Sequence, residues 1–84
     1  MKDCMITFRS VTPAQTAEGL LRKAHISCQL RRTPRWLQEQ GCGYSLWLSK
    51  GDAMAAVTLL REKGVAFRKV YLQTEKGMAR ELEL

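Results

Sequence analysis

The sequence predicts an α+β domain, because segments with strand and helix patterns alternate in the order strand, helix, strand, and do so twice. Short β-rich segments occupy residues 4–9, 27–32, 43–48 and 65–72. Moving the chain by 39 residues lays residues 17–22 over 56–61, which marks an internal repeat. Two βαβ halves in one short domain predict a ferredoxin-like βαββαβ sandwich.

The first half contains a helix with recognisable ends. Thr12 is placed as the N-cap, with Pro13 at the first helical position and Gln15 completing a capping box. We expect the helix to end near His25, which tolerates a positive φ better than most residues. Its buried face is predicted to consist of Ala14, Ala17, Leu20, Leu21 and Ala24.

The second half follows the same plan. Ser49 is placed as the N-cap of its helix, and Asp52 lies in the first turn, where a carboxylate suits the helix dipole. Lys63 and Gly64 provide a C-terminal end with a cation and then a glycine. The predicted inner stripe is Ala53, Ala56, Val57 and Leu60. We therefore divide the chain into a ferredoxin-like domain, residues 1–72, and a polar C-terminal tail or short helix, residues 73–84.

Right-handed crossovers place segments 4–9 and 43–48 at the centre of a four-stranded antiparallel sheet, with both helices on one face. Segment 43–48 is apolar on both sides, since it carries Trp47 on the side opposite Leu46. Apolar groups on the open face predict a partner. We expect either a homodimer formed sheet to sheet or coverage of this face by the C-terminal tail.

The composition fits one small soluble domain, with 84 residues, 45% hydrophobic and 26% charged. No apolar run approaches the roughly 20 residues of a membrane span, and the first residues show no secretory signal. We therefore expect no membrane partner and a cytoplasmic protein. The net charge of +6 favours an anionic partner, whether nucleic acid, a phosphorylated small molecule or an acidic protein surface.

The candidate site is the long loop between the two halves. Cys42 lies between two glycines, which permit close approach to its sulfur. If the loop folds back, the arginines at its other end would lower the pKa of Cys42 and make it reactive; the alternative is a small residue in a turn. Around a reactive Cys42, the residues predicted to bind an anion or a partner are Arg31, Arg32, Arg35, Trp36, Gly41 and Gly43.

The other two cysteines fall in strand patterns. Cys4 is interpreted as a small core residue, whereas Cys28 is either structural or a resolving partner of Cys42. The three cysteines lack paired spacing, which predicts reduced thiols and not disulfides. A metal centre would need these cysteines and His25, but no CxxC or HxxxH spacing is present. We expect no metal and no cofactor.

The basic and aromatic residues of the loop are also how a single-strand nucleic-acid surface begins. RNA-recognition modules of this fold carry a run of glycine, aromatic and basic residues on a central strand. Residues 43–48 contain no basic residue, so this signature is absent, and a nucleic-acid partner stays open. No carboxylates cluster near His25 or the loop, which makes a stand-alone acid–base enzyme the least supported function.

Residues 5–8, 17–21, 33–35 and 42–43 together resemble the selenium/sulfur carrier-like family of small bacterial domains, and the resemblance runs over residues 4–72. It implies that Cys42 holds sulfur or selenium as a persulfide or perselenide. A desulfurase-like donor protein would supply the atom and an acceptor would receive it. Arg35 would stabilise the thiolate or an anionic ligand. Residues 34–42 are longer and bulkier than the family's serine-rich loop, which leaves the pose of Cys42 open.

Two functions therefore stand side by side. The first is a sulfur or selenium carrier that uses Cys42. The second is a non-catalytic ferredoxin-like binding or regulatory module, which recognises an anionic ligand, a nucleic acid or a protein partner.

Overall fold

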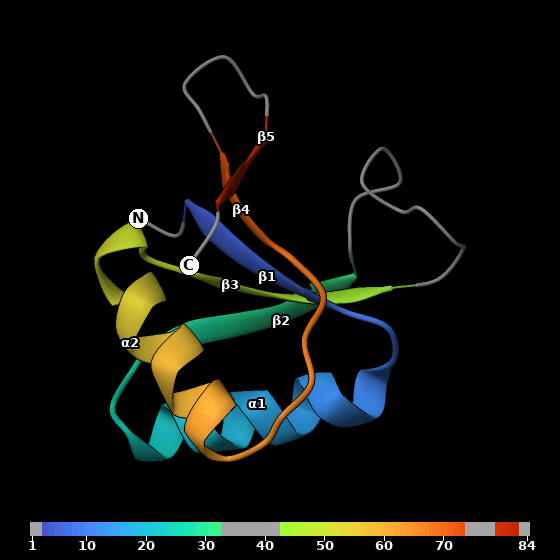
Figure 1. Cartoon of the computed structure of the whole chain (residues 1–84), viewed down its shortest axis with the longest axis vertical. Helices are drawn as coiled ribbons and strands as arrows, with labels where there is room; N and C mark the ends of the chain where they lie inside the picture. The colour runs from blue at the N-terminus through green and yellow to red at the C-terminus, as the bar shows by residue number, and fades with distance from the viewer. Residues whose placement is uncertain (1–2, 33–42, 74–78, 83–84) are drawn as a thin grey trace.

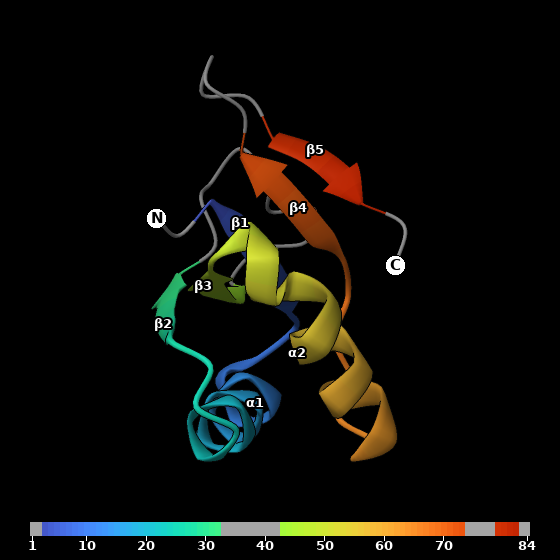
Figure 2. The same cartoon turned by 90° about the vertical axis from the view of Figure 1, so that its left-hand side faces the viewer.

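The computed structural model describes residues 3–32, 43–73 and 79–82, and its strands form one antiparallel sheet in the order β2-β3-β1-β4-β5. Both helices lie on the same face of this sheet (Figures 1 and 2). The βαββαβ order with β1 beside β3 at the centre confirms the predicted ferredoxin-like fold. The elements are β1 (Cys4–Phe8), α1 (Val11–Lys23), β2 (Cys28–Arg32), β3 (Tyr44–Leu48), α2 (Lys50–Glu62), β4 (Val70–Gln73) and β5 (Ala79–Leu82).

Within residues 73–84, predicted as a polar tail or short helix, residues 79–82 form the strand β5. Residues 79–82 pair antiparallel with β4, from Val70 opposite Leu82 to Gln73 opposite Ala79. Without this hairpin, β4 would leave a row of backbone donors and acceptors unpaired, and pairing them outweighs the weak helical pattern of the tail. Because β5 lies beside β4, residues 79–82 extend the sheet and do not cover its open face (Figure 2).

The core lies between the sheet and the two helices. Alternate residues of the strands face the helices, as the period of a strand requires. The predicted inner stripe of α2 is confirmed, as are Ala14, Ala17 and Leu21 of α1, whereas Ala24 is exposed because it is the C-cap of α1. The buried core residues are Cys4, Ile6, Phe8, Ala14, Ala17, Leu21, Cys28, Leu46, Leu48, Ala53, Ala56, Val57, Leu60 and Val70.

The C-terminal ends of both helices are as predicted from the sequence, whereas the N-terminus of α1 is not. His25 has a φ of 62° and Gly64 a φ of 70°, so both helices end in the left-handed conformation, as predicted. The N-cap of α1 is Ser10 and not Thr12, and Ser10 makes no side-chain cap hydrogen bond. The predicted capping box is therefore wrong. The helix begins at Val11, so Thr12 lies inside it and Pro13 is its third residue, not its first.

The internal repeat holds for the helices and fails by one residue in the strands. Both helices have 13 residues, and their N-caps Ser10 and Ser49 are 39 positions apart. Phe8, however, belongs to the core, whereas Trp47 lies on the opposite face, so these two residues are not equivalent. The reason is that two residues separate β1 from α1 but Ser49 alone separates β3 from α2. The additional residue is Arg9.

A bulge delays the start of β4 relative to the predicted strand 65–72. Arg68 and Lys69 both lie opposite Thr7: the Arg68 N–H donates to the Thr7 carbonyl, and the Thr7 N–H donates to the Lys69 carbonyl, each at 2.8 Å. This two-against-one arrangement is that of a β-bulge. The Thr7 hydroxyl completes it by accepting from the Lys69 N–H at 3.1 Å and donating to the Lys69 carbonyl at 3.2 Å.

The Thr7→Val substitution tests this arrangement, because it keeps the shape of the side chain and removes the hydroxyl. Thr7 is only 7% exposed, so the Lys69 backbone groups would lose a partner that water cannot easily replace. We expect the free energy of unfolding to fall by about 1–3 kcal/mol, measured by urea denaturation.

Thr7→Ser is the matched control, since it retains the hydroxyl and loses a methyl group. It should cost clearly less than Thr7→Val. Equal losses in the two variants would show that the hydroxyl does not support the bulge.

Candidate functional site

The ends of β1 and β2 and the start of β3 lie together at one end of the sheet. β1 ends at Phe8 and β2 at Arg32, and both residues pair with Tyr44, the first residue of β3. Gly43 precedes Tyr44, and Cys42 is the next residue back along the sequence. Through Gly43, the residue after Cys42 in the sequence, the described chain therefore enters β3 at this end of the sheet (Figure 1). We call it the basic end, after the cations that belong to it: Arg9, Arg31, Arg32, Arg68 and Lys69.

Three of the predicted site residues belong to the part of the chain that the structure describes. These are Arg31, Arg32 and Gly43, and all three lie at the basic end. The other four predicted residues lie outside the described residues, so their assignment to the site stays a prediction: Arg35, Trp36, Gly41 and Cys42.

The adjacent arginines of β2 do not form one cluster, because successive side chains of a strand point to opposite faces. Arg31 lies on the helix-free face, where its Cζ atom is 5.7 Å from the centroid of the Trp47 ring. Arg32 lies on the other face, with its Cζ atom 6.0 Å from the centroid of Tyr44, which packs against the core. Each guanidinium therefore stacks on a different aromatic side chain of β3, an arrangement that favours both groups.

A small hydrogen-bonded network fixes the Arg31 side of the sheet. The Trp47 Nε1–H donates to the Ser45 hydroxyl at 3.0 Å, and that hydroxyl donates to the Arg31 carbonyl at 3.4 Å. The Arg31 guanidinium donates to Gln29 Oε1 at 2.6 Å. Ser45 is fully buried although it lies on the face without helices. Sequence reasoning missed Ser45, whose signal was its two-residue spacing from Trp47.

The helix-free face carries a row of large side chains across three strands. Met5 of β1 is paired with Trp47 on one side and with Tyr71 on the other. Met5 is 1% exposed, so this face has a closed apolar centre. The predicted apolar group on the open face, Trp47, is therefore present, and the homodimer stays a prediction.

Ser45→Ala should destabilise the protein by about 1–2 kcal/mol, because it leaves the Trp47 N–H without its buried acceptor. Trp47→Phe removes the N–H and keeps an aromatic ring. The two changes share one interaction, so their effects on the free energy of unfolding should not add.

A double-mutant cycle with Ser45→Ala, Trp47→Phe and both together checks this by urea unfolding. We expect a coupling energy of about 0.5–1.5 kcal/mol. Strict additivity would mean that the hydrogen bond contributes nothing to stability.

Two of the three cysteines are buried in the domain as free thiols. Cys4 is 0% exposed, and its burial raises the pKa of the thiol from 9.0 to about 11, with a further contribution from the Asp3 charge. Cys28 is 8% exposed and pairs with Leu48, four residues along β3 from Tyr44. That separation is about 13 Å. Cys42 lies outside the described residues, so a resolving role for Cys28 stays a prediction.

The raised pKa of Cys4 gives a testable pH dependence. Well below pH 9 the thiol is protonated in both folded and unfolded chains, so it has no effect on stability. Between pH 9 and about 11 the unfolded chain loses this proton more readily, so stability falls as the pH rises. The loss attributable to Cys4 should reach about 1 kcal/mol by pH 10.

The comparison that isolates this effect is the wild type against Cys4→Ala. The free energy of unfolding should decline more steeply between pH 8 and pH 10.5 in the wild type, whatever the starting stability of the variant. Parallel pH profiles would show that Cys4 keeps an ordinary pKa in the folded protein.

Two further features bear on the class of site. Within residues 3–32, 43–73 and 79–82, no group of three His, Cys, Asp or Glu side chains is arranged to hold a metal ion. Neither described helix is long and apolar enough to cross a membrane. His25 has the conformation of a helix-ending residue, which accounts for its position.

Fold and site together define a small ferredoxin-like α+β domain whose two halves are joined by a cysteine-bearing segment at a basic end of the sheet. The chain belongs to the family described as "Putative Se/S carrier protein-like", whose family model matches residues 3–72. This match confirms the resemblance found in the sequence. Neither the curated proteins nor the solved structures contain a match to the chain.

Proposed function

We propose that the protein carries sulfur or selenium on Cys42, as a persulfide or perselenide, between a donor protein and an acceptor. The observation that carries this proposal is the family match over residues 3–72. The burial of Cys4 and Cys28 adds support, because neither is accessible to a protein partner. Cys42 is the remaining cysteine of the chain.

The transfer requires only thiol exchange. The Cys42 thiolate attacks the terminal sulfur of a persulfide on the donor, the donor S–S bond breaks, and the donor cysteine leaves as a thiol after taking up a proton. Cys42 then holds the sulfane sulfur, and an acceptor thiolate removes it by the same exchange. Oxidation states balance without a cofactor, and the reactive form of the cysteine is the thiolate.

The electrostatics of the basic end favour that thiolate. Arg32 pairs with Tyr44, and Arg9 follows Phe8, which also pairs with Tyr44, so both cations belong to strand ends beside the start of β3. Nearby positive charge stabilises an anion and lowers the pKa of a thiol. The same charge attracts an anionic persulfide on a donor and increases the rate of encounter.

Incubation with a cysteine desulfurase and cysteine tests the proposal. Intact mass spectrometry should show the gain of one sulfur atom in the wild type and its loss on treatment with dithiothreitol. Cys42→Ser should gain nothing, whereas Cys28→Ala should be loaded like the wild type, because Cys28 is a buried strand residue. A selenocysteine lyase with selenocysteine gives the corresponding selenium test.

Equal loading of Cys42→Ser and wild type, or no loading of any variant by either donor, would contradict the carrier function. Each variant is first shown to be folded by its thermal unfolding transition. This control separates the loss of a carrier residue from the loss of the fold.

A second candidate function is a non-catalytic binding module, and the stacking of Arg31 on Trp47 favours it. A basic side chain beside a partly exposed aromatic strand residue is the kind of surface that binds the bases and phosphates of a single-stranded nucleic acid. This function would produce salt-dependent binding that Arg31→Gln weakens and Cys42→Ser leaves unchanged.

A further inference from the structure

A pocket of about 560 Å³ opens between the turn that leads into α1 and the segment that leads from α2 to β4. Its lining contains three cations, Arg9, Arg68 and Lys69, together with the apolar side chains of Pro13, Ala66 and Phe67. None of the described residues that line it is acidic. A cavity with one cationic and one apolar side fits a ligand that has both characters.

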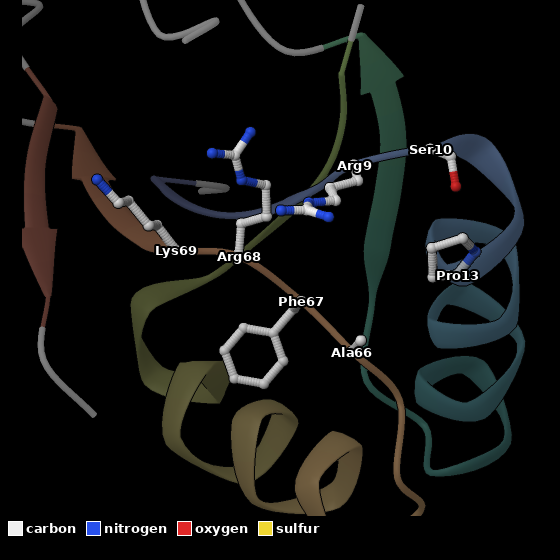
Figure 3. A pocket seen from close by; sticks show the side chains of 7 residues that line it. All are labelled: Arg9, Ser10, Pro13, Ala66, Phe67, Arg68 and Lys69. Atoms are coloured by element: carbon white, nitrogen blue, oxygen red, sulfur yellow. The ribbon is translucent and has the colours of Figure 1, made fainter. Parts of the chain in front are cut away.

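The two arginines come from segments far apart in the sequence, and both line this pocket. Figure 3 shows the guanidinium groups of Arg9 and Arg68 in the same region, on one side of the segment that carries Arg68, and the ring of Phe67 on the side that faces α2. Lys69 lies on the β4 side and points away from the pair. An anion placed between the two guanidinium groups would be attracted by both.

The fold holds both sides of the pocket in place. Arg68 is fixed by the bulge, because its N–H donates to the Thr7 carbonyl at 2.8 Å. Arg9 is the residue by which the first strand–helix turn exceeds the second. Phe67 packs against the core, and the Arg61 Cζ atom of α2 lies 5.8 Å from its ring centroid. The pocket is thus formed without a ligand, which reduces the cost of binding one.

The N-terminus of α1 adds to the positive field of these cations. Its N-cap Ser10 makes no side-chain cap hydrogen bond, and the first turn has no acidic residue. At the N-terminus of α2, by contrast, Asp52 lies in the first turn and Asp3 Oδ1 accepts from the Lys50 N–H at 2.9 Å. The helix dipole at α1 therefore favours the same sign of ligand charge as the arginines do.

We propose that this pocket binds a small phosphate-bearing molecule with an apolar or aromatic body, such as a nucleoside monophosphate. The phosphate would lie between Arg9 and Arg68, whose planar guanidinium groups match phosphate oxygens in pairs. The body would pack on Phe67 and Pro13. The pocket volume lies in the usual range for small-molecule sites, about 300–1,000 Å³. This binding does not depend on Cys42.

Adenosine monophosphate, adenosine and inorganic phosphate are the probes, titrated into the protein and followed by calorimetry and backbone amide NMR. Adenosine monophosphate should bind more tightly than either fragment, with shifts at Val11, Thr12 and residues 66–69. Arg9→Gln and Arg68→Gln should each weaken binding at least tenfold, since each removes a charge-assisted contact. Lys23→Gln is the matched control, because it removes the same charge from the last turn of α1.

An unchanged affinity in the arginine variants, or an equal loss in Lys23→Gln, would overturn the proposal and leave only non-specific charge attraction. The same holds if inorganic phosphate binds as tightly as adenosine monophosphate, or if a single-stranded oligoadenylate binds far more tightly than either without shifts at residues 66–69. Cys42→Ser should bind adenosine monophosphate as the wild type does. Pocket binding and chalcogen transfer can therefore fail independently.

Discussion

The pairing of β1 on both of its sides is the constraint on which the rest of the structure depends. All five residues of β1 are buried, and the strand pairs with β3 along its whole length and with β4 over its first three residues. A strand in this position has no freedom to slip, because a shift by one residue would turn every core side chain to the wrong face. Its register therefore fixes which termini meet at the basic end.

That register also decides what a cluster in the sequence becomes in space. Arg31 and Arg32 are neighbours along the chain, yet their side chains lie on opposite faces of the sheet because strand residues alternate. Arg31 contacts the ring of Trp47, and Arg32 contacts the ring of Tyr44. In the reverse direction, Arg9 and Arg68 are distant in the sequence and line one pocket. Two arginines that are adjacent in the sequence thus lie on different faces of the sheet, and two that are distant in the sequence line the same pocket.

The predictable parts of the fold are those determined within a few residues. The buried stripe of α2 and the left-handed residues His25 and Gly64 follow from local spacing and local backbone preference, so sequence alone was sufficient for them. The burial of Cys4 followed from its strand pattern in the same way.

The parts that could not be predicted depend on contacts between distant residues. Thr7 and Lys69 are 62 positions apart, and their hydrogen bonds belong to the bulge that makes β4 begin at Val70 and not at residue 65 as predicted. The strand β5 forms because β4 has an open edge, a property of the assembled sheet and not of the tail itself. The pocket was missed for the same reason, since no local pattern joins residues 9–13 to 66–69.

The two proposed activities would share the electrostatic field of Arg9, because Arg9 follows the residue of β1 that pairs with the start of β3. If a charged persulfide on Cys42 comes within that field, an anion held by Arg9 would make the persulfide less stable, and by linkage the persulfide would weaken binding of the anion. Occupation of the pocket would thus oppose chalcogen loading, and the strength of that opposition would fall with salt over a screening length of about 10 Å.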